Sequence, residues 1–325
     1  MARGAVTSSL HHRAIVLTAG TTFLLLLVGG VVHATDSGLA CPDWPQCFGS
    51  FFPPMVGKVF FEHGHRLFAT GVGILTIVQL VLVYRGRRAG HPARGLAVAA
   101  LFLVVFQGVL GGMTVKMQLP DAVSTAHLAT SMVFFSLLIL LAFRTRPATQ
   151  DVALSTGLRR AIGAATVLVY LQIVLGALVR HTDSGLACTT LPLCGGSVLP
   201  LGLDWRLVLH AAHRLGAIAT GVVVIGASLA ALSAADANRT VRRLALVAPG
   251  LVVVQIALGV MSVLSALEVV TVTAHLGGGA LLLATMVSMF LGARAVDGEA
   301  VVRTPARDDL PIGSIDAAAD DTVRA

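Results

Sequence analysis

Eight long apolar runs constrain the fold of this chain more than any other feature of its sequence. They cover residues 14–33, 62–84, 95–115, 122–143, 161–179, 207–232, 244–264 and 270–293. Each is long enough to cross a bilayer as a helix, which takes roughly 20 residues. A backbone inside lipid must satisfy its own hydrogen bonds, so helices are the expected elements. The sequence therefore predicts an all-α membrane protein with eight transmembrane helices.

The composition supports a membrane protein. Of the 325 residues, 56% are hydrophobic and 12% are charged, a balance that a soluble domain cannot accommodate. The net charge of +7 does not indicate nucleic acid, because the basic residues lie in short loops between the apolar runs. Membrane lipid is the expected surrounding. The first run is followed by seven more, which favours a retained helix over a cleaved signal peptide.

The basic residues also predict the orientation. Of the 23 Lys and Arg residues, 17 lie on the side that carries both termini, which the positive-inside rule makes cytoplasmic. The Ala- and Arg-rich usage and the absence of a transit-like N-terminus favour a bacterial cell membrane. Residues 294–325 are rich in Ala, Asp and Pro, and we expect a disordered cytoplasmic tail there.

The chain contains an internal repeat. The seven residues 35–41 recur unchanged as residues 182–188, which low-complexity apolar helices do not explain because the segment is a polar loop. Three further groups recur at an offset one residue larger: His65-Arg66-Leu67 as His213-Arg214-Leu215, Gln107, Gly111 and Met113 as Gln255, Gly259 and Met261, and Ala126-His127-Leu128 as Ala274-His275-Leu276. Each copy holds four spans, so both enter the membrane in the same direction. The sequence predicts two parallel four-helix-bundle repeats, residues 1–150 and 151–293.

Two histidines recur in each repeat. They are His65 and His127 in the first and His213 and His275 in the second. All four lie near the starts of spans that begin on the predicted outer side, so they share one depth. An imidazole in a membrane helix usually faces the bundle interior and has a partner or a task. Two histidines facing each other across a four-helix bundle suit bis-imidazole ligation of heme iron.

Other interpretations apply to these residues. A single histidine near a helix end is often an interfacial residue with a satisfied hydrogen bond, and zinc usually needs three or four nearby ligands rather than pairs. Arg66 and Arg214 directly follow two of the candidate ligands. They are positioned to contact heme propionates, or equally to extend to water and lipid phosphate.

All four cysteines lie in the predicted outer loops, as the pairs Cys41 and Cys47, and Cys188 and Cys194. This distribution favours an oxidising compartment and two short disulfides. Of the three possible connectivities, local pairing fits the repeat best. Closing such a loop contributes roughly 2 kcal/mol to stability in the chain-entropy model, which favours a structural role, although exchange near a redox centre is a second hypothesis.

The two repeats differ at one acidic position. Glu62 lies three residues before His65, on the same helix face, and its counterpart in the second repeat is His210. This difference favours a division of labour, with a resident cofactor in the second half and the molecule being changed in the first. A carboxylate there can transfer protons or stabilise positive charge. The alternative is that Glu62 only stabilises its own helix terminus.

Together these features resemble the heme A synthase family. The resemblance rests on the eight spans in two halves, the outer cysteine pairs, the run Glu62-His-Gly-His65-Arg66, and His127, His213-Arg214 and His275, and it extends over residues 12–293. It implies that His213 and His275 bind a heme B cofactor, and that His65 and His127 bind the substrate, heme O. It also implies that Glu62 is important for activity.

The resemblance further implies a reaction. Two successive hydroxylations would convert the C8 methyl group of heme O to a formyl group, giving heme A for cytochrome oxidase. Heme O synthase and a quinone or another membrane electron carrier are the expected partners. A membrane cytochrome that passes electrons from quinol is the main alternative, but transmembrane transfer favours hemes stacked across the bilayer. A transporter built from repeats would have charged or broken helices at the midplane, where these spans are almost wholly apolar.

Overall fold

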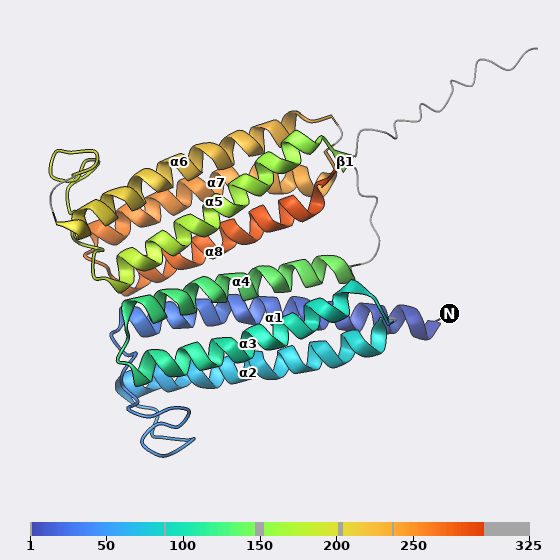
Figure 1. The fold of residues 1–325 in the computed structure, drawn as a ribbon, viewed down its shortest axis with the longest axis horizontal. Coiled ribbons are helices and arrows are strands. Elements are labelled where there is room, and N and C mark those ends of the chain that lie inside the picture. Colours follow the sequence, from blue (N-terminus) through green and yellow to red (C-terminus); the bar gives the residue numbers. More distant parts are fainter. Residues whose placement is uncertain (1, 88, 147–152, 201–203, 236, 296–325) are drawn as a thin grey trace, which may run out of the picture.

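A computed structural model describes residues 2–87, 89–146, 153–200, 204–235 and 237–295 (Figure 1). Its helices are α1 (Ala2–Ala34), α2 (Gly57–Gly86), α3 (Pro92–Lys116), α4 (Asp121–Thr145), α5 (Thr156–His181), α6 (Trp205–Ser233), α7 (Arg239–Leu264) and α8 (Val269–Gly292). Two short strands, β1 (Ala153–Leu154) and β2 (Arg294–Ala295), complete the described elements. The predicted cytoplasmic tail lies almost wholly outside the described residues.

All eight helices are long and apolar enough to cross a membrane, which confirms the predicted all-α membrane fold. Large apolar side chains point outward along the helices. Phe102 on α3 is 69% exposed and Leu246 on α7 is 66% exposed, as expected of side chains that contact lipid. Several helices begin earlier than the apolar runs predict, and α2 starts at Gly57 rather than at residue 62. The residues added to α2, 57–61, are one glycine, one lysine, one valine and two phenylalanines.

The helices pack in two groups of four (Figure 1). Within the first group, α1 contacts α2 and α4, and α3 contacts α2 and α4; within the second, α5 contacts α6 and α8, and α7 contacts α6 and α8. The groups meet through contacts of α1 with α8 and of α4 with α5 and α8. This grouping agrees with the sequence repeat. The organisation as parallel repeats stays a prediction, and its boundary at residue 150 lies outside the described residues.

The junction between the two groups is part of the hydrophobic core. One buried cluster includes Leu26 of α1 and Phe135 of α4 together with Val224 of α6 and Met286 of α8. Smaller clusters lie within the first group, and one of them contains Ile15, which is fully buried. Because apolar side chains from both groups share one packed cluster, the two groups form one body.

The identical loop segments have a structural explanation. Asp36 and Asp183 both adopt a left-handed backbone conformation, with φ of 49° and 53°. Two residues later, a Cβ on Gly38 would lie 3.3 Å from the side chain of Leu119, which belongs to the turn between α3 and α4. In the same way, a Cβ on Gly185 would lie 3.2 Å from the side chain of Leu267, which belongs to the turn between α7 and α8. Both copies therefore need a glycine to bring a leucine of the next hairpin against the loop.

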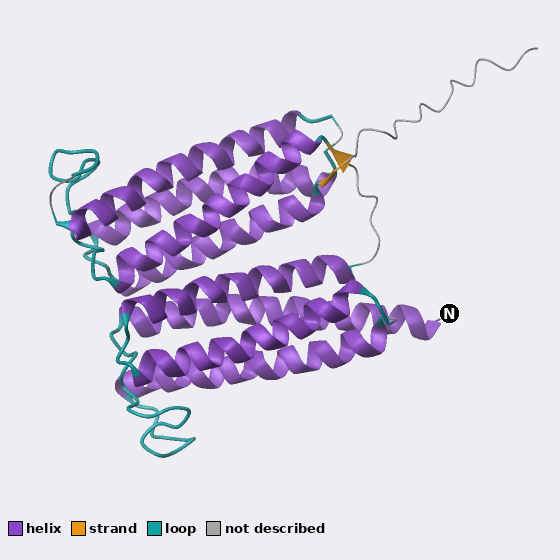
Figure 2. Ribbon diagram, viewed as in Figure 1, coloured by secondary structure: helices purple, strands orange, loops and turns teal. Residues whose placement is uncertain are grey.

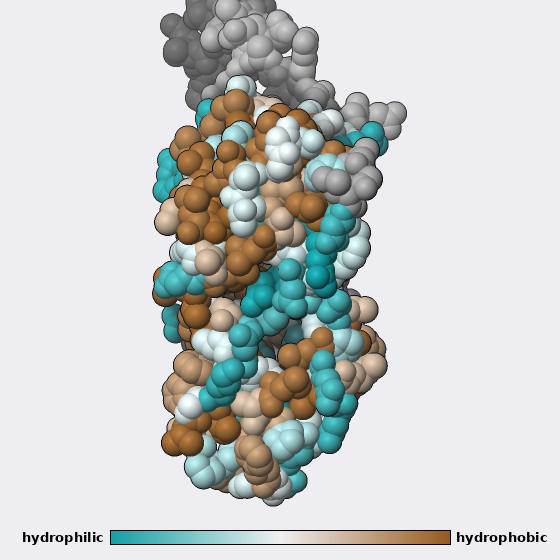
Figure 3. Space-filling view, turned by 90° about the vertical axis from the view of Figure 1, so that its left-hand side faces the viewer, coloured by the Kyte–Doolittle hydropathy of each residue, from teal (hydrophilic) through white to brown (hydrophobic). Residues whose placement is uncertain are grey.

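The two ends of the molecule differ. At one end, β1 and β2 pair in parallel and join the start of the second group to its last helix (Figure 2). The other end carries both cysteine loops, and we call it the disulfide end. The N-terminus lies away from it, and α1 and α5 both run towards it (Figure 1). Figure 3 looks onto the disulfide end, where polar residues cross the middle of the face between more apolar regions.

Candidate heme sites

The four candidate ligands lie on the helices that start at the disulfide end. His65 is on α2, His127 on α4, His213 on α6 and His275 on α8, and all four are half-buried. Each lies about two turns from the start of its helix, so the four rings share one depth in the molecule. No described residue forms a hydrogen bond with Nε2 of any of these histidines, and none of these atoms is sealed by packing.

A glycine of the preceding helix makes room for every one of these rings. The distances from a Cβ built on the glycine to Cε1 of the ring are 3.2 Å for Gly29 and His65, 3.4 Å for Gly111 and His127, 2.8 Å for Gly176 and His213, and 3.1 Å for Gly259 and His275. Contacts this short leave little or no space for a methyl group. The glycines recur at the offsets of the repeat, so the placement of the rings is built into both copies.

The two histidines of the second half face each other at a separation that fits one metal ion. The ring centroids of His213 and His275 are 6.5 Å apart, and the ring planes are nearly perpendicular, at 84°. A metal–imidazole bond of about 2.0–2.1 Å and a ring radius of about 1.1 Å place two opposed centroids roughly 6.3 Å apart. The pair therefore fits axial ligation of a single heme iron.

Zinc fits these histidines less well. Among the described residues, the only group of three or more candidate metal ligands is Cys41, Cys47 and His63. Cys41 and Cys47 are joined by a disulfide, so their sulfurs are not thiolate ligands here. None of the four repeated histidines belongs to such a group, whereas a structural zinc site takes four ligands. Pairs of imidazoles suit ligation of heme iron.

Glu62 lies inside the molecule, beneath the first cysteine loop. It is 4% exposed, and its Oε2 accepts a hydrogen bond from the backbone nitrogen of Cys41 at 2.7 Å. Its other oxygen pairs with Arg66. Arg66 in turn donates to the carbonyl oxygens of Asp43 and Gln46, at 2.7 and 2.6 Å. The two side chains thus fasten the loop to α2, and their predicted roles in proton transfer and propionate binding stay predictions.

Arg214 makes the corresponding contacts in the second half. It donates to the carbonyl oxygens of Thr190 and Cys188, at 2.7 and 2.5 Å. Thr190 corresponds to Asp43. The corresponding arginines of the two copies therefore bond the carbonyl oxygen at the same loop position. The second loop is closed by the Cys188–Cys194 disulfide, as the first is by Cys41–Cys47. In the second half, α6 carries His210 at the position of Glu62, and this histidine is also 4% exposed.

The two loops differ in what closes their tips. Asp43 accepts hydrogen bonds from the backbone nitrogens of Phe48 and Gly49, at 2.7 and 2.8 Å. These bonds stabilise the charged form, so they lower the pKa of the Asp43 carboxyl, with the bond from Gly49 as the largest cause. In the second loop a hydroxyl takes this place, because Thr190 Oγ1 accepts from Gly195 at 2.9 Å. Only the first tip depends on a charge.

At the disulfide end, α1 and α5 meet through two histidines. The ring centroids of His33 and His181 are 5.0 Å apart. Thr125 of α4 lies 3.0 Å from Nδ1 of His181, measured from its hydroxyl oxygen, and Arg180 donates to the carbonyl oxygen of His33 at 3.3 Å. These groups provide polar contacts between the two halves at the disulfide end, close in sequence to the repeated loops.

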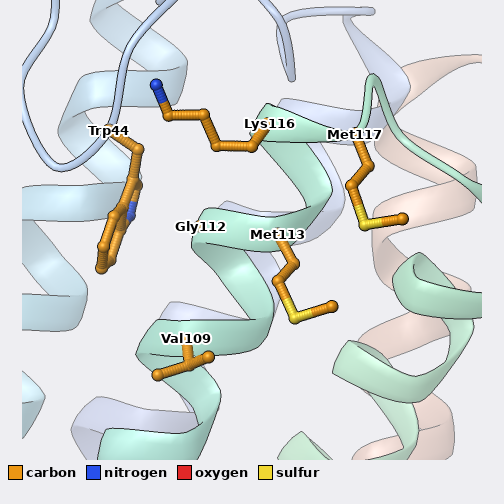
Figure 4. A pocket seen from close by; sticks show the side chains of 6 residues that line it. All are labelled: Trp44, Val109, Gly112, Met113, Lys116 and Met117. Carbon is orange, nitrogen blue, oxygen red and sulfur yellow. The ribbon is translucent and has the colours of Figure 1, made fainter.

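A small groove opens beside the first site (Figure 4). It has a volume of about 260 Å³ and is lined by Trp44, Val109, Gly112, Met113, Lys116 and Met117. The indole of Trp44 lies against Gly112, where a Cβ would come within 2.8 Å of the ring. Gly112 follows Gly111, the glycine beneath His127. The first loop is therefore held against α3 as well as against α2.

Comparison with known proteins identifies the family. The model of the cytochrome oxidase assembly protein family (COX15-CtaA) matches residues 12–58 and 55–287. The chain belongs to this family. The membership agrees with the resemblance that the histidine pairs and loops predict.

Several relatives are named heme A synthase. The protein from Symbiobacterium thermophilum is 36% identical over 64% of this chain and 71% of its own length. That from Shewanella oneidensis is 32% identical over 64% and 75%, and that from Alkalihalophilus pseudofirmus is 32% identical over 62% and 69%. The similarity thus extends over most of each relative.

The residues that support the histidines were not predicted from the sequence. Gln107, Gly111 and their counterparts indicated only a repeat, and Gly29, Gly176 and Gln172 were not among the expected site residues. A signal was present, because a glutamine precedes the glycine by four residues in α3, α5 and α7. Residues four apart lie on one helix face, so this spacing indicates a shared contact.

Proposed function

We propose that this chain is a heme A synthase, which converts the C8 methyl group of heme O to a formyl group and thereby supports cytochrome oxidase assembly. The observation that carries the proposal is the pair of repeated histidine sites in a member of this family. One of these sites has imidazoles 6.5 Å apart, the separation that one heme iron needs. The relatives named heme A synthase support the same activity.

The two sites take different hemes in this proposal. His213 and His275 hold heme B as a resident cofactor, and His65 and His127 hold heme O as the substrate. Heme B supplies a redox centre that exchanges one electron at a time. The glycines beneath the four rings let the helices approach closely enough to orient the imidazoles. The apolar helices keep bulk water from the porphyrins, which strengthens electrostatic interactions inside the sites.

Glu62 is the proposed catalytic carboxylate. It is buried one turn from His65 and forms a salt bridge with Arg66. Removal of hydrogen from a methyl carbon releases protons, which a carboxylate at this position can accept. Arg66 and Arg214 lie at the loop-facing side of the two sites, where they can contact heme propionates by exchanging one of their loop carbonyl partners.

The overall change takes place on one carbon of the substrate. A first hydroxylation gives a hydroxymethyl group, and a second gives a gem-diol that loses water to leave the aldehyde. The proposed partners are heme O synthase, which would supply the substrate, and a quinone or another membrane carrier, which would exchange electrons. The proposed location is a bacterial cell membrane, with both termini in the cytoplasm and the disulfide end outside.

Pigment analysis of cells lacking this protein tests the proposal. We expect such cells to accumulate heme O and to lose heme A, and we expect the intact gene to restore heme A. Normal heme A in the deletion strain would refute the function. That result would instead favour a bis-histidine cytochrome without substrate chemistry, whose loss changes electron transfer from quinol but not the pigments.

A further inference from the structure

Three of the four candidate ligands have a glutamine beside them. These glutamines are Gln107 on α3, Gln172 on α5 and Gln255 on α7, each four residues before the glycine that touches the ring. The corresponding residue of α1 is Leu25, four residues before Gly29. His65 is therefore the one candidate ligand whose preceding helix provides no amide.

The amides bond to the histidines directly. Nε2 of Gln172 lies 2.8 Å from Nδ1 of His213 and donates to its carbonyl oxygen at 2.8 Å. When the amide oxygen and nitrogen of Gln107 are exchanged, both atoms have suitable partners. The nitrogen then donates to Nδ1 of His127 at 2.9 Å, and the oxygen accepts from the backbone nitrogen of Ser131 at 2.9 Å. An amide is both donor and acceptor, so it can bond Nδ1 in either protonation state of the ring.

The contact at His275 is of the same kind but incomplete. Gln255 donates to the carbonyl oxygen of His275 at 2.8 Å. Oε1 of this glutamine and Nδ1 of His275 are both buried without a hydrogen-bond partner among the described residues. Gln255 therefore bonds the backbone of His275, and its unpaired Oε1 is the kind of acceptor that the Nδ1 proton of an iron-bound imidazole takes.

The helix that carries each histidine also provides space for the amide. Three residues after His213 and His275 stand Gly216 and Gly278, where a Cβ would collide with Oε1 of Gln172 and of Gln255. After His127 the position is Thr130, which bonds Gln107. After His65 it is Phe68.

At His65 these features are replaced by apolar side chains. Leu25 packs on the cluster formed by Val72, Ala100, Phe134 and Leu138, and Nδ1 of His65 is buried without a hydrogen-bond partner among the described residues. A hydrogen bond at Nδ1 fixes the orientation of a metal-bound imidazole and makes it a stronger ligand. His65 has neither benefit, so only packing against Gly29 and its neighbours orients its ring.

We propose that His65 is the exchangeable ligand of the first site and that Leu25 makes it so, because each of the other three ligands has a glutamine that bonds its ring or its backbone. This inference rests on the proposed function, in which the first site must admit a heme and release it whereas the second keeps its heme. A ligand that is held weakly would dissociate from a bound heme more readily than the opposite ligand, which would keep its position. The glutamines are positioning residues that act on iron through the imidazoles.

Heme release measures this difference in the full-length protein. The purified chain in detergent is saturated with hemin and mixed with excess apomyoglobin, which captures the heme that each site releases. We expect two phases, and the fast one should be absent from His65→Ala. Carbon monoxide binding to the reduced protein provides a second readout, because it requires an open axial position. We expect it at the first site.

Two exchanges between the halves test the role of the amide. Leu25→Gln combined with Phe68→Gly should slow the fast phase by about tenfold or more and reduce carbon monoxide binding, because loss of such a partner typically costs 10–100-fold in metal affinity. Gln172→Leu should accelerate release from the second site by a similar factor. Leu25→Ala is the matched control, which alters packing without adding an amide, and should leave the fast phase no slower.

The outcomes separate the inference from the function. Equal release rates from the two sites, or unchanged rates in Gln172→Leu, would overturn the inference while two bound hemes still support the function. If the Leu25→Gln variant does not fold, Gln172→Leu still decides. A protein that binds no hemin at all would instead contradict the proposed function.

Discussion

The two halves share a scaffold and differ around one ligand. Both have a glycine beneath each histidine, a cysteine loop and an arginine that holds the loop carbonyls. Four differences are Glu62 in place of His210, His63 in place of Ala211, Leu25 in place of Gln172, and Asp43 in place of Thr190. A duplicated site that keeps its ligands can therefore acquire a second task through the residues that surround one of them.

Removal of a ligand tests the division between the halves with the largest expected effect. In His213→Ala, we expect complete loss of the bound heme B spectrum, because one imidazole of the pair that is 6.5 Å apart is gone. His65→Ala is the matched variant in the first half and should keep that spectrum. Optical spectra of the purified proteins provide the measurement. A heme B spectrum that survives in His213→Ala would refute the ligand assignment.

Substitution of Glu62 tests the acidic difference. We expect Glu62→Ala to retain heme B but to lower heme A output by about 10² or more, the usual contribution of a general acid or base. Heme O or its hydroxylated form should accumulate, which pigment extraction detects.

Glu62→Gln separates this role from loop anchoring. The amide oxygen can still accept a hydrogen bond from the backbone nitrogen of Cys41, but the glutamine side chain is neutral and cannot accept a proton as a carboxylate does. Heme A output should stay low in this variant. Output restored to the normal level would show that Glu62 only holds the loop.

A methyl group beneath a ring tests the shared scaffold. Gly176→Ala places a Cβ 2.8 Å from Cε1 of His213, and we expect a loss of about 1–3 kcal/mol in stability together with weaker heme B binding. Gly250→Ala on α7 is the control, because no atom lies within 4 Å of its Cβ. Thermal unfolding and heme titration measure both effects. Equal behaviour of the two variants would contradict the packing argument.

Acid should destabilise the tip of the first cysteine loop but not that of the second, and this is the smallest of the expected effects. The pKa of Asp43 is lowered in the folded protein, so its bonds to Phe48 and Gly49 contribute stability above the unfolded pKa of about 3.9, and this contribution is lost as pH falls through the folded pKa. Hydrogen exchange of the two loop tips between about pH 6 and about pH 3 measures this difference.

The tip held by Thr190 provides the internal control for acid sensitivity. Its hydroxyl does not titrate in this range, so exchange at Gly195 should show no such acid step. Asp43→Asn should remove the step from the first loop as well. A first loop whose protection is the same at both pH values would show that the carboxylate charge does not hold its tip.

The sequence by itself determined the membrane spans, the repeat and the residue types that carry the chemistry. Insertion in lipid depends on the summed hydrophobicity of about 20 consecutive residues, which is a local property that can be counted along the chain. The duplication was equally visible, because a polar loop with seven identical residues has no compositional explanation. The four histidines, Glu62 and the cysteine pairs all followed from these two observations.

Only the tertiary structure decided where those side chains point and what supports them. The rotation of each helix against its neighbours is set by packing between segments far apart in sequence, and no local pattern specifies it. For this reason the sequence placed Glu62 only on the helix face of His65, whereas the structure shows its carboxylate buried between Cys41 and Arg66. For the same reason Leu25 looked like any other apolar residue until the packing of α1 against α2 placed it where the other helices carry a glutamine.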